Sequence, residues 1–192
     1  MDHDLHFTGD DAADRLLSTD PLALIIGMLL DQQVAMETAF AGPQKLHERL
    51  GGFDATKLAA MDPDDLTEVM RQTPAVHRYP GSMAKRIVAL AAAVEESYGG
   101  DVTRLWTDGD PGGAEILKRL KKLPGFGEQK AKIFLALLGK QCGLEAPGWR
   151  ETAGEYGEEG ARRSIADVVD EDTLLQVRET KRAMKAAAKQ KA

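Results

Sequence analysis

The chain has 192 residues and a mass of 20.8 kDa, enough for one domain or for two lobes that share one chain, but short for two independent domains. Its apolar fraction of 43% and charged fraction of 29% are those of a globular protein, which excludes a disordered or fibrous chain. The net charge of −6 argues, as an average over the whole chain, against a polyanionic partner.

The first third of the chain predicts helices. The run Leu22–Leu30 is apolar nearly all round, as in a central buried helix, and a second helix is expected from about Gln33 to Leu50, interrupted near Gly42-Pro43. Three Asp-Pro pairs each offer an N-cap oxygen followed by proline at the first helical position. These pairs are Asp20-Pro21, Asp62-Pro63 and Asp110-Pro111.

The rest of the chain continues in the same way. Ser82 is expected to cap a longer helix that ends at Gly99-Gly100, and two shorter helices with a turn between them fall within about 114–140. Residues 143–160 are expected to form a loop because five glycines lie in this stretch, and a last helix is expected from about Asp172. No stretch shows sustained alternation with a period of two, so the predicted fold class is all-α.

The charge is distributed unevenly along the chain. The first 20 residues carry six aspartates against one arginine. Residues 114–140 carry seven basic and two acidic residues, and residues 175–192 carry six basic residues against one glutamate. Such a run is most often a solvated helix face, and we interpret the C-terminal tail in that way. The basic segment at 114–140 has a further feature.

That feature is the segment Leu123-Pro124-Gly125-Phe126-Gly127, which lies between two helical patterns. Two glycines one residue apart let the backbone turn sharply and approach another group closely. The helix that follows presents its first amides and the positive end of its dipole, which together suit a phosphate oxygen. Taken alone, the segment favours a tight turn whose glycines only allow packing, because short glycine turns are common.

Three segments resemble one known family, the third more weakly than the other two. The hairpin, followed by Ala131 and Ile133, resembles the helix-hairpin-helix of the HhH-GPD base-excision DNA glycosylases. The segment Leu29-Leu30-Asp31-Gln32-Gln33-Val34 is similar to the family's Leu-x-Gln-Gln segment, and the segment from Pro80 to Ile87 is a weaker echo of a third one. Within the superfamily the chain is most similar to the side of 3-methyladenine DNA glycosylase II.

The resemblance implies a two-lobed helical fold. Residues 20–138 would form the core lobe, with the helix-hairpin-helix at about 114–140, and residues 1–19 together with 139–192 would form the second lobe and the basic tail. It also implies a protein that binds double-stranded DNA and removes a damaged base. The DNA-binding residues expected from the motifs are Gln32, Gln33, Leu123, Gly125, Phe126, Gly127, Lys130 and Lys132.

The catalytic residues of the family are not matched. Its members place an aspartate about twenty residues after the hairpin, but the corresponding stretch, Leu144–Glu151, contains none. Members with lyase activity carry a lysine where this chain has Gln129, and Lys130 comes one position late, which turns a helical side chain by about 100°. The resemblance therefore implies a monofunctional N-glycosylase without AP-lyase activity, or a DNA-binding or lesion-recognition module that has lost the catalytic carboxylate.

Two carboxylates could replace the missing aspartate. Asp31 precedes the glutamine pair, where the resemblance puts the base pocket, but it could also be the N-cap of the next helix. Glu145 is nearest in sequence to the family's aspartate, but it could also be a solvated loop glutamate.

No resident cofactor is expected. The single cysteine, Cys142, cannot hold an iron–sulfur cluster, which needs four ligands, and four scattered histidines lack the spacing of a zinc site. A monovalent cation at the hairpin is allowed by the resemblance. The longest apolar run has nine residues and no secretion signal opens the chain, so we expect a cytoplasmic protein that does not enter membranes, with a monomer favoured.

Overall fold

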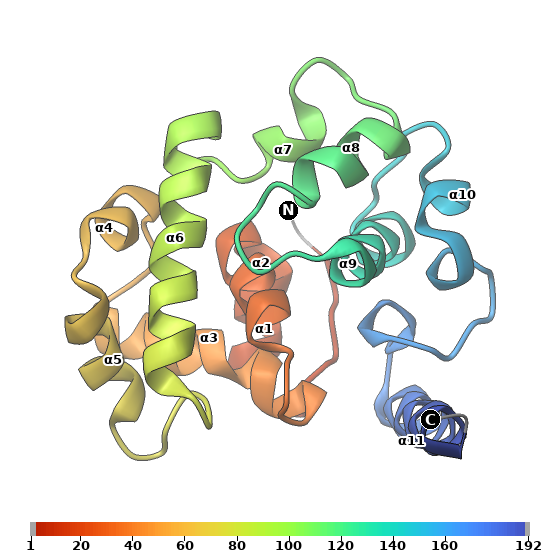
Figure 1. The fold of residues 1–192 in the computed structure, drawn as a ribbon, viewed down its shortest axis with the longest axis horizontal. Helices are drawn as coiled ribbons and strands as arrows, with labels where there is room; N and C mark the ends of the chain where they lie inside the picture. Colours follow the sequence, from red (N-terminus) through yellow and green to blue (C-terminus); the bar gives the residue numbers. More distant parts are fainter. Residues whose placement is uncertain (1–2, 191–192) are drawn as a thin grey trace.

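A computed structural model describes residues 3–190 of the chain, with side chains described to residue 187. This part contains eleven α-helices, two short 3-10 helices and no strand, which confirms the all-α prediction (Figure 1). None of the helices in the described range is both long and apolar enough to cross a membrane. The elements are α1 (Asp11–Thr19), α2 (Pro21–Leu30), α3 (Met36–Leu50), α4 (Ala55–Ala60), α5 (Pro63–Arg71), α6 (Pro80–Tyr98), α7 (Arg104–Thr107), α8 (Gly113–Leu120), α9 (Glu128–Gln141), α10 (Trp149–Ala153), η1 (Gly154–Tyr156), η2 (Ile165–Asp167) and α11 (Glu171–Gln190).

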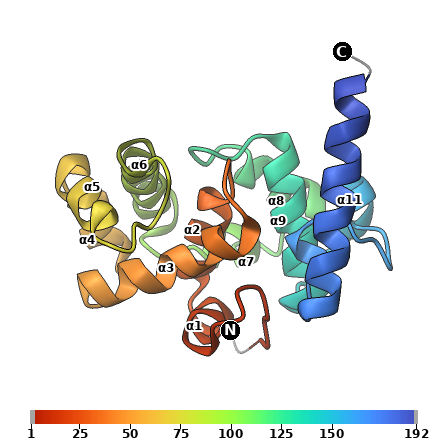
Figure 2. The same ribbon diagram turned by 90° about the horizontal axis from the view of Figure 1, so that it is seen from below.

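Helix α2 lies at the centre of the molecule, as its apolar sequence predicts. Every residue from Leu22 to Leu30 is buried, and the helix packs against α1, α3, α6 and α9 (Figure 2). Its start is the expected Asp-Pro cap, because the Asp20 carboxylate accepts hydrogen bonds from the amides of Leu22 and Ala23 at 2.8 and 3.1 Å. The buried helix fixes where its C-terminal turn, Asp31–Ala35, meets the surface.

Only one of the other two Asp-Pro pairs behaves as expected. Asp62 caps α5 through the amide of Asp64 at 2.8 Å, whereas α8 begins at Gly113, two residues after Pro111. The reason is a tertiary contact: the Gly113 amide donates to the Pro147 carbonyl at 2.8 Å, and a Cβ on Gly113 would lie 2.4 Å from the Trp149 Cα. This contact with the segment before α10 decides where α8 starts.

Two other predicted helix boundaries were wrong. Helix α3 begins at Met36 and not at Gln33, and it continues through Gly42-Pro43 without interruption, since only one amide is lost at the proline and both residues are buried. Helix α6 begins at Pro80, with Tyr79 as its N-cap, so Ser82 is not the cap. Proline at the first helical position explains the earlier start.

The predicted loop at 143–160 contains α10 and η1, so that prediction was wrong in part. Its glycines do form turns, because Gly148 and Gly154 have φ values of +69° and +59°. Its aromatic residues, however, are anchored on the core. The Trp149 ring covers Gly139 of α9 so closely that a Cβ there would lie 2.4 Å from it, and Tyr156 is buried.

Around α2, the helices are arranged in local groups. Helix α6 packs against α4 and α5, α1 packs against α2 and α3, and α9 packs against α8, α10 and η2. Helix α11 begins at Glu171, one residue before the expected start, and contacts the body through η2 (Figure 2). The division into a core lobe of residues 20–138 and a second lobe stays a prediction.

Candidate nucleic-acid interface

The segment between α8 and α9 forms the predicted hairpin. Leu123 and Phe126 are both buried, and the Phe126 amide donates to the Leu123 carbonyl at 3.1 Å. The Phe126 ring meets the Phe134 ring edge-on, with centroids 6.0 Å apart. These two side chains hold the hairpin on the core, so any contact of Leu123 or Phe126 with DNA would come from the backbone.

The two hairpin glycines have different surroundings. Gly125 has a φ of +83°, and a Cβ there would lie 2.4 Å from Leu29 Cδ1, so the hairpin rests directly on the last turn of α2. Gly127 is the N-cap of α9, with a φ of −72° and open space around its Cα. No described side chain caps α9, so its first amides face the open side with the dipole's positive end.

Lys130 connects this hairpin to the turn after α2. Its ammonium donates to the carbonyls of Met28, Leu29 and Asp31 at 2.7, 3.0 and 3.3 Å, which are groups that the end of a helix leaves unpaired. Burial lowers the pKa of Lys130 to about 8, while the negative charge of Asp31 acts in the opposite direction. The ammonium is therefore mainly charged at pH 7, and its charge serves the C-terminal end of α2.

His77 holds the same turn from the other side. Its Nε2 lies 3.2 Å from the Leu30 carbonyl and 3.1 Å from the Gln32 carbonyl, and its Nδ1 accepts from the Tyr79 amide at 3.0 Å. Because Nδ1 is an acceptor, the ring is neutral with its proton on Nε2. Burial lowers the pKa of His77, which agrees with a neutral ring.

The two glutamines of the turn have different roles. The Gln32 side chain donates to the Leu29 carbonyl at 2.8 Å and accepts from Arg86 of α6, so it is held in place. Gln33 has a φ of +58° and an exposed side chain. A non-glycine residue in this region of backbone space is uncommon and is stabilised here by the bonds on either side. The turn is therefore fixed, and Gln33 projects from it.

The structure separates the two candidate carboxylates. Asp31 is the C-cap of α2, whereas the N-cap of α3 is Ala35, so the alternative of Asp31 as an N-cap was wrong. Its side chain is only 13% exposed, and its Oδ2 lies 3.8 Å from the Lys181 ammonium of α11. Glu145 is exposed beyond the C-terminal end of α9, about 16 Å of helix away from Lys130. Asp31 thus lies with the glutamine pair and the hairpin, and Glu145 does not.

This geometry agrees with a comparison of the whole sequence. A model of the HhH-GPD superfamily of base excision DNA repair proteins matches residues 26–189. The chain belongs to the HhH-GPD superfamily. No curated protein and no solved structure matched it in similar comparisons. The matched region includes the turn after α2, the hairpin and nearly all of α11, so DNA repair and DNA binding follow from membership of the superfamily.

Within this HhH-GPD fold, Gln129, where the resemblance leads us to expect the lysine of a lyase, is bonded to a neutral partner. Gln129 donates from Nε2 to the Tyr156 hydroxyl at 2.8 Å. Sequence analysis does not place Tyr156 or His77 at the site and interprets the α11 cations as a solvated face, because all of them contact the site only after folding. Arg86 lies in the third segment that resembles the family, but nothing in that segment indicated its bond to Gln32.

The positive charge at the HhH-GPD hairpin is partly neutralised. Glu128, the first residue of α9, lies 2.8 Å from the Lys121 ammonium and 3.0 Å from that of Lys132. Hydrogen bonds from Lys121 and then Lys132 lower the pKa of Glu128 to about 2, so the carboxylate stays ionised at neutral pH. Two of the lysines beside the hairpin are therefore already paired.

Replacing Glu128 by glutamine is expected to strengthen binding to duplex DNA, because it frees Lys121 and Lys132 for phosphates. Each newly contacted phosphate should steepen the dependence of log Kd on log salt by about 0.9, which a salt titration by fluorescence anisotropy measures. Glu96→Gln removes an equal charge from an exposed position on α6 and is the control. Equal salt slopes for the two variants would contradict the expected release.

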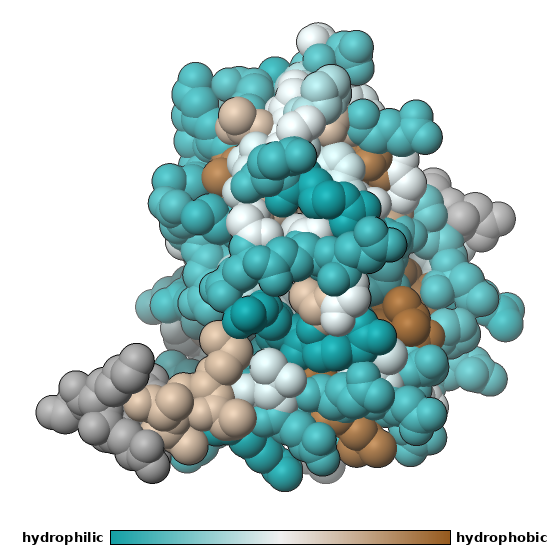
Figure 3. All heavy atoms as spheres, turned by 90° about the vertical axis from the view of Figure 1, so that its right-hand side faces the viewer, coloured by the Kyte–Doolittle hydropathy of each residue, from teal (hydrophilic) through white to brown (hydrophobic). Residues whose placement is uncertain are grey.

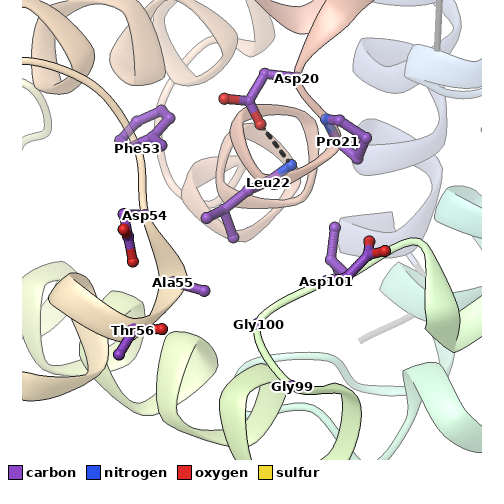
Figure 4. Close-up of a pocket in the computed structure, with 11 residues that line it drawn as sticks. Asp20, Pro21, Leu22, Phe53, Asp54, Ala55, Thr56, Gly99, Gly100 and Asp101 are labelled. Carbon is purple, nitrogen blue, oxygen red and sulfur yellow. Dashed lines mark hydrogen bonds between the residues drawn. The ribbon is translucent and has the colours of Figure 1, made fainter.

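A separate hollow lies elsewhere on the protein. It has a volume of about 380 Å³, lies by the start of α2, and carries three aspartates on its wall (Figure 4). Each is used in capping or turn formation, since Asp20 accepts from Leu22, Asp54 from the Lys57 amide and Asp101 from the Thr103 amide. Among the described residues, no three His, Cys, Asp or Glu side chains are grouped to hold a metal ion. An acidic wall does not suit DNA, so this hollow is not part of the candidate interface.

Proposed function

We propose that the protein is a monofunctional DNA glycosylase that binds duplex DNA and hydrolyses the N-glycosidic bond of a damaged base, with Asp31 as the catalytic carboxylate. The observation that carries the proposal is the position of Asp31: it lies in a turn tied to the helix-hairpin-helix by Lys130. The resemblance to 3-methyladenine DNA glycosylase II makes an alkylated base the first substrate to test.

The chemistry needs few groups. A base must leave the stack before its glycosidic bond can be attacked, and a carboxylate then stabilises the oxocarbenium-like sugar or activates water. Asp31 is largely buried beside the exposed Gln33, which would enter the space that the base leaves. The hairpin amides would hold the phosphate backbone.

The same residues argue against a lyase step. An amide such as Gln129 cannot form the Schiff base that a lyase needs, and its Nε2 is bonded to Tyr156. The neighbouring Lys130 is bonded to three backbone carbonyls. Base removal without strand cleavage is therefore the expected reaction.

Duplexes with single alkylated, deaminated or oxidised bases test the proposal. Asp31→Asn is expected to reduce base release about 100- to 1000-fold, the cost of removing a group that stabilises the transition state, whereas Glu145→Gln should stay within about twofold of the wild type. Release is measured by alkaline cleavage of the product strand, and thermal melting checks that both variants fold. If the wild type releases none of these bases, the protein is not a glycosylase for these classes.

One observation favours a second function, lesion recognition without catalysis. The stretch that corresponds to the family's catalytic aspartate leads into α10 through Pro147-Gly148 and contains no aspartate. For such a module the expected result is tighter binding to one lesion duplex than to undamaged duplex, with no base released. Measuring binding and release on the same oligonucleotides separates the two functions.

A further inference from the structure

Helix α11 carries a row of positive charge. Arg178, Lys181, Arg182 and Lys185 follow one another at spacings of three, one and three residues, which places all four on one face of the helix. With 20 residues, α11 is about 30 Å long. We call these four residues the basic stripe.

The basic stripe begins at the candidate site. Arg178 forms an ion pair with Glu37 in the first turn of α3, and the Lys181 ammonium lies 3.8 Å from Asp31 Oδ2. The second oxygen of Glu37 is buried and has no hydrogen-bond partner among the described residues. Both acids lie on or next to the turn after α2, so the two inner cations cover the acidic side of that turn.

The outer two residues of the basic stripe, Arg182 and Lys185, lie on the exposed part of α11. The helix is attached through its first turns, where Val177 is fully buried and the Thr173 hydroxyl is bonded to Asp170. From Arg182 to Ala187 every residue is exposed, and neither Arg182 nor Lys185 has an ion pair within the described part of the chain. Figure 2 shows α11 extending past the other helices, and Figure 3 shows that this side of the molecule is mainly hydrophilic.

Like charges three and four residues apart repel each other, so an unpaired row of them disfavours the helix that carries it. A polyanion that lies along the stripe removes this repulsion. Duplex DNA is the polyanion that members of this superfamily bind. The basic stripe begins beside Asp31, in the turn that Lys130 joins to the hairpin, so a duplex on the hairpin would lie close to it. The protein's own acids at Glu37 and Asp31 already occupy the two positions nearest the site, as phosphates would.

We propose that α11 is a DNA-binding arm whose basic stripe contacts phosphates of the duplex beyond the hairpin. In the free protein, Glu37 and Asp31 hold Arg178 and Lys181. The side chains of Arg178 and Lys181 are 37% and 39% exposed, so phosphates can reach these two cations and displace the carboxylates when DNA binds. The release of Lys181 thereby uncovers Asp31 only in the complex with DNA. The inference rests on the proposed function only in that the protein binds duplex DNA.

The outer cations provide the first test. Arg182→Ala with Lys185→Ala is expected to weaken binding to an undamaged 30-base-pair duplex about tenfold at low salt and to reduce the salt slope by about two. Alanine is a strong helix former, so α11 persists, which circular dichroism checks. The matched control is Arg15→Ala with Lys57→Ala, which removes the same charge from exposed positions on α1 and α4. Equal affinity and slope for the two double variants would overturn the arm.

The inner pair provides the second test, as a double-mutant cycle. Glu37→Gln should tighten duplex binding more than the control Glu96→Gln does in the wild-type background. In an Arg178→Ala background the two should have equal effects, because no cation is left to release. A gain from Glu37→Gln that persists without Arg178 would overturn the proposed exchange.

The outcome also distinguishes the two proposals. If the wild type binds no duplex at low salt, the arm and the proposed function are both lost. If the wild type binds and Gly127→Ala weakens binding while the outer double variant does not, only the arm is lost. Weaker binding of the outer variant in a protein that releases no base supports the arm and rejects the glycosylase.

Discussion

Alanine at position 127 is expected to weaken duplex binding about tenfold while leaving the free energy of unfolding within about 0.5 kcal/mol of the wild type. The backbone of Gly127 suits any residue, with φ −72° and ψ 173°, and no atom beyond the adjacent residues lies within 4 Å of the added methyl group. The methyl group would instead stand between the first amides of α9 and a phosphate oxygen. Anisotropy titrations and urea unfolding measure the two quantities separately.

Gly125→Ala is the matched comparison, because it should lower the stability of the fold, which Gly127→Ala leaves nearly unchanged. Position 125 has a φ of +83°, and a Cβ would lie 2.4 Å from Leu29 Cδ1, so backbone strain and overpacking add. We expect a loss of about 2–4 kcal/mol of stability, visible in urea unfolding. Unchanged DNA binding by Gly127→Ala would show that phosphates do not approach the hairpin amides.

Lys130→Met is expected to cost about 2–4 kcal/mol of stability, the second large effect. Methionine has a similar length and fills the same space, but the carbonyls of Met28 and Asp31 lose this donor, and that of Leu29 keeps only its bond from Gln32. A buried acceptor without a partner costs the free energy of its desolvation, and the favourable charge at the end of α2 disappears as well. Urea unfolding at pH 7 measures the loss.

The control is Lys132→Met, two residues along the same helix. Lys132 is paired only with the exposed Glu128 in the described structure, so its removal should change stability by no more than about 0.5 kcal/mol. Equal stability of the two methionine variants would mean that Lys130 does not support the turn after α2. Both variants lose one positive charge, so a difference between them comes from the contacts.

Much of the helical framework could be predicted from local sequence. Helix α2 is predicted by two local signals. The apolar run Leu22–Leu30 indicates a buried helix, and the Asp20-Pro21 cap indicates where that helix starts. The start of α8 and the helix α10 could not be found in this way. Both depend on the approach of Gly113 to the Trp149 backbone, a contact between segments far apart in the chain that leaves no periodic signal.

The candidate site was predictable only in part, for the same reason. The spacing of Gly125 and Gly127 identifies the hairpin, and the glutamine pair identifies the turn after α2. Each of these signals lies within a few residues of the chain. That Lys130 would bond to α2 and not extend into solvent depends on a contact over about a hundred residues of chain. The ion pairs of Asp31 and Glu37 with α11 likewise depend on how that helix packs against the rest of the protein. Its charged sequence alone indicates a solvated face.

Lys130 also determines how the protein would measure distance along a DNA strand. It belongs to the helix whose first amides face the phosphate, and it is bonded to the turn that carries Gln33. The first amides of α9 and the projecting glutamine are therefore linked through the contacts of a single side chain. The nucleotide opposite Gln33 would then lie a constant number of steps from the contacted phosphate, whatever the sequence, so the offset is a property of the fold.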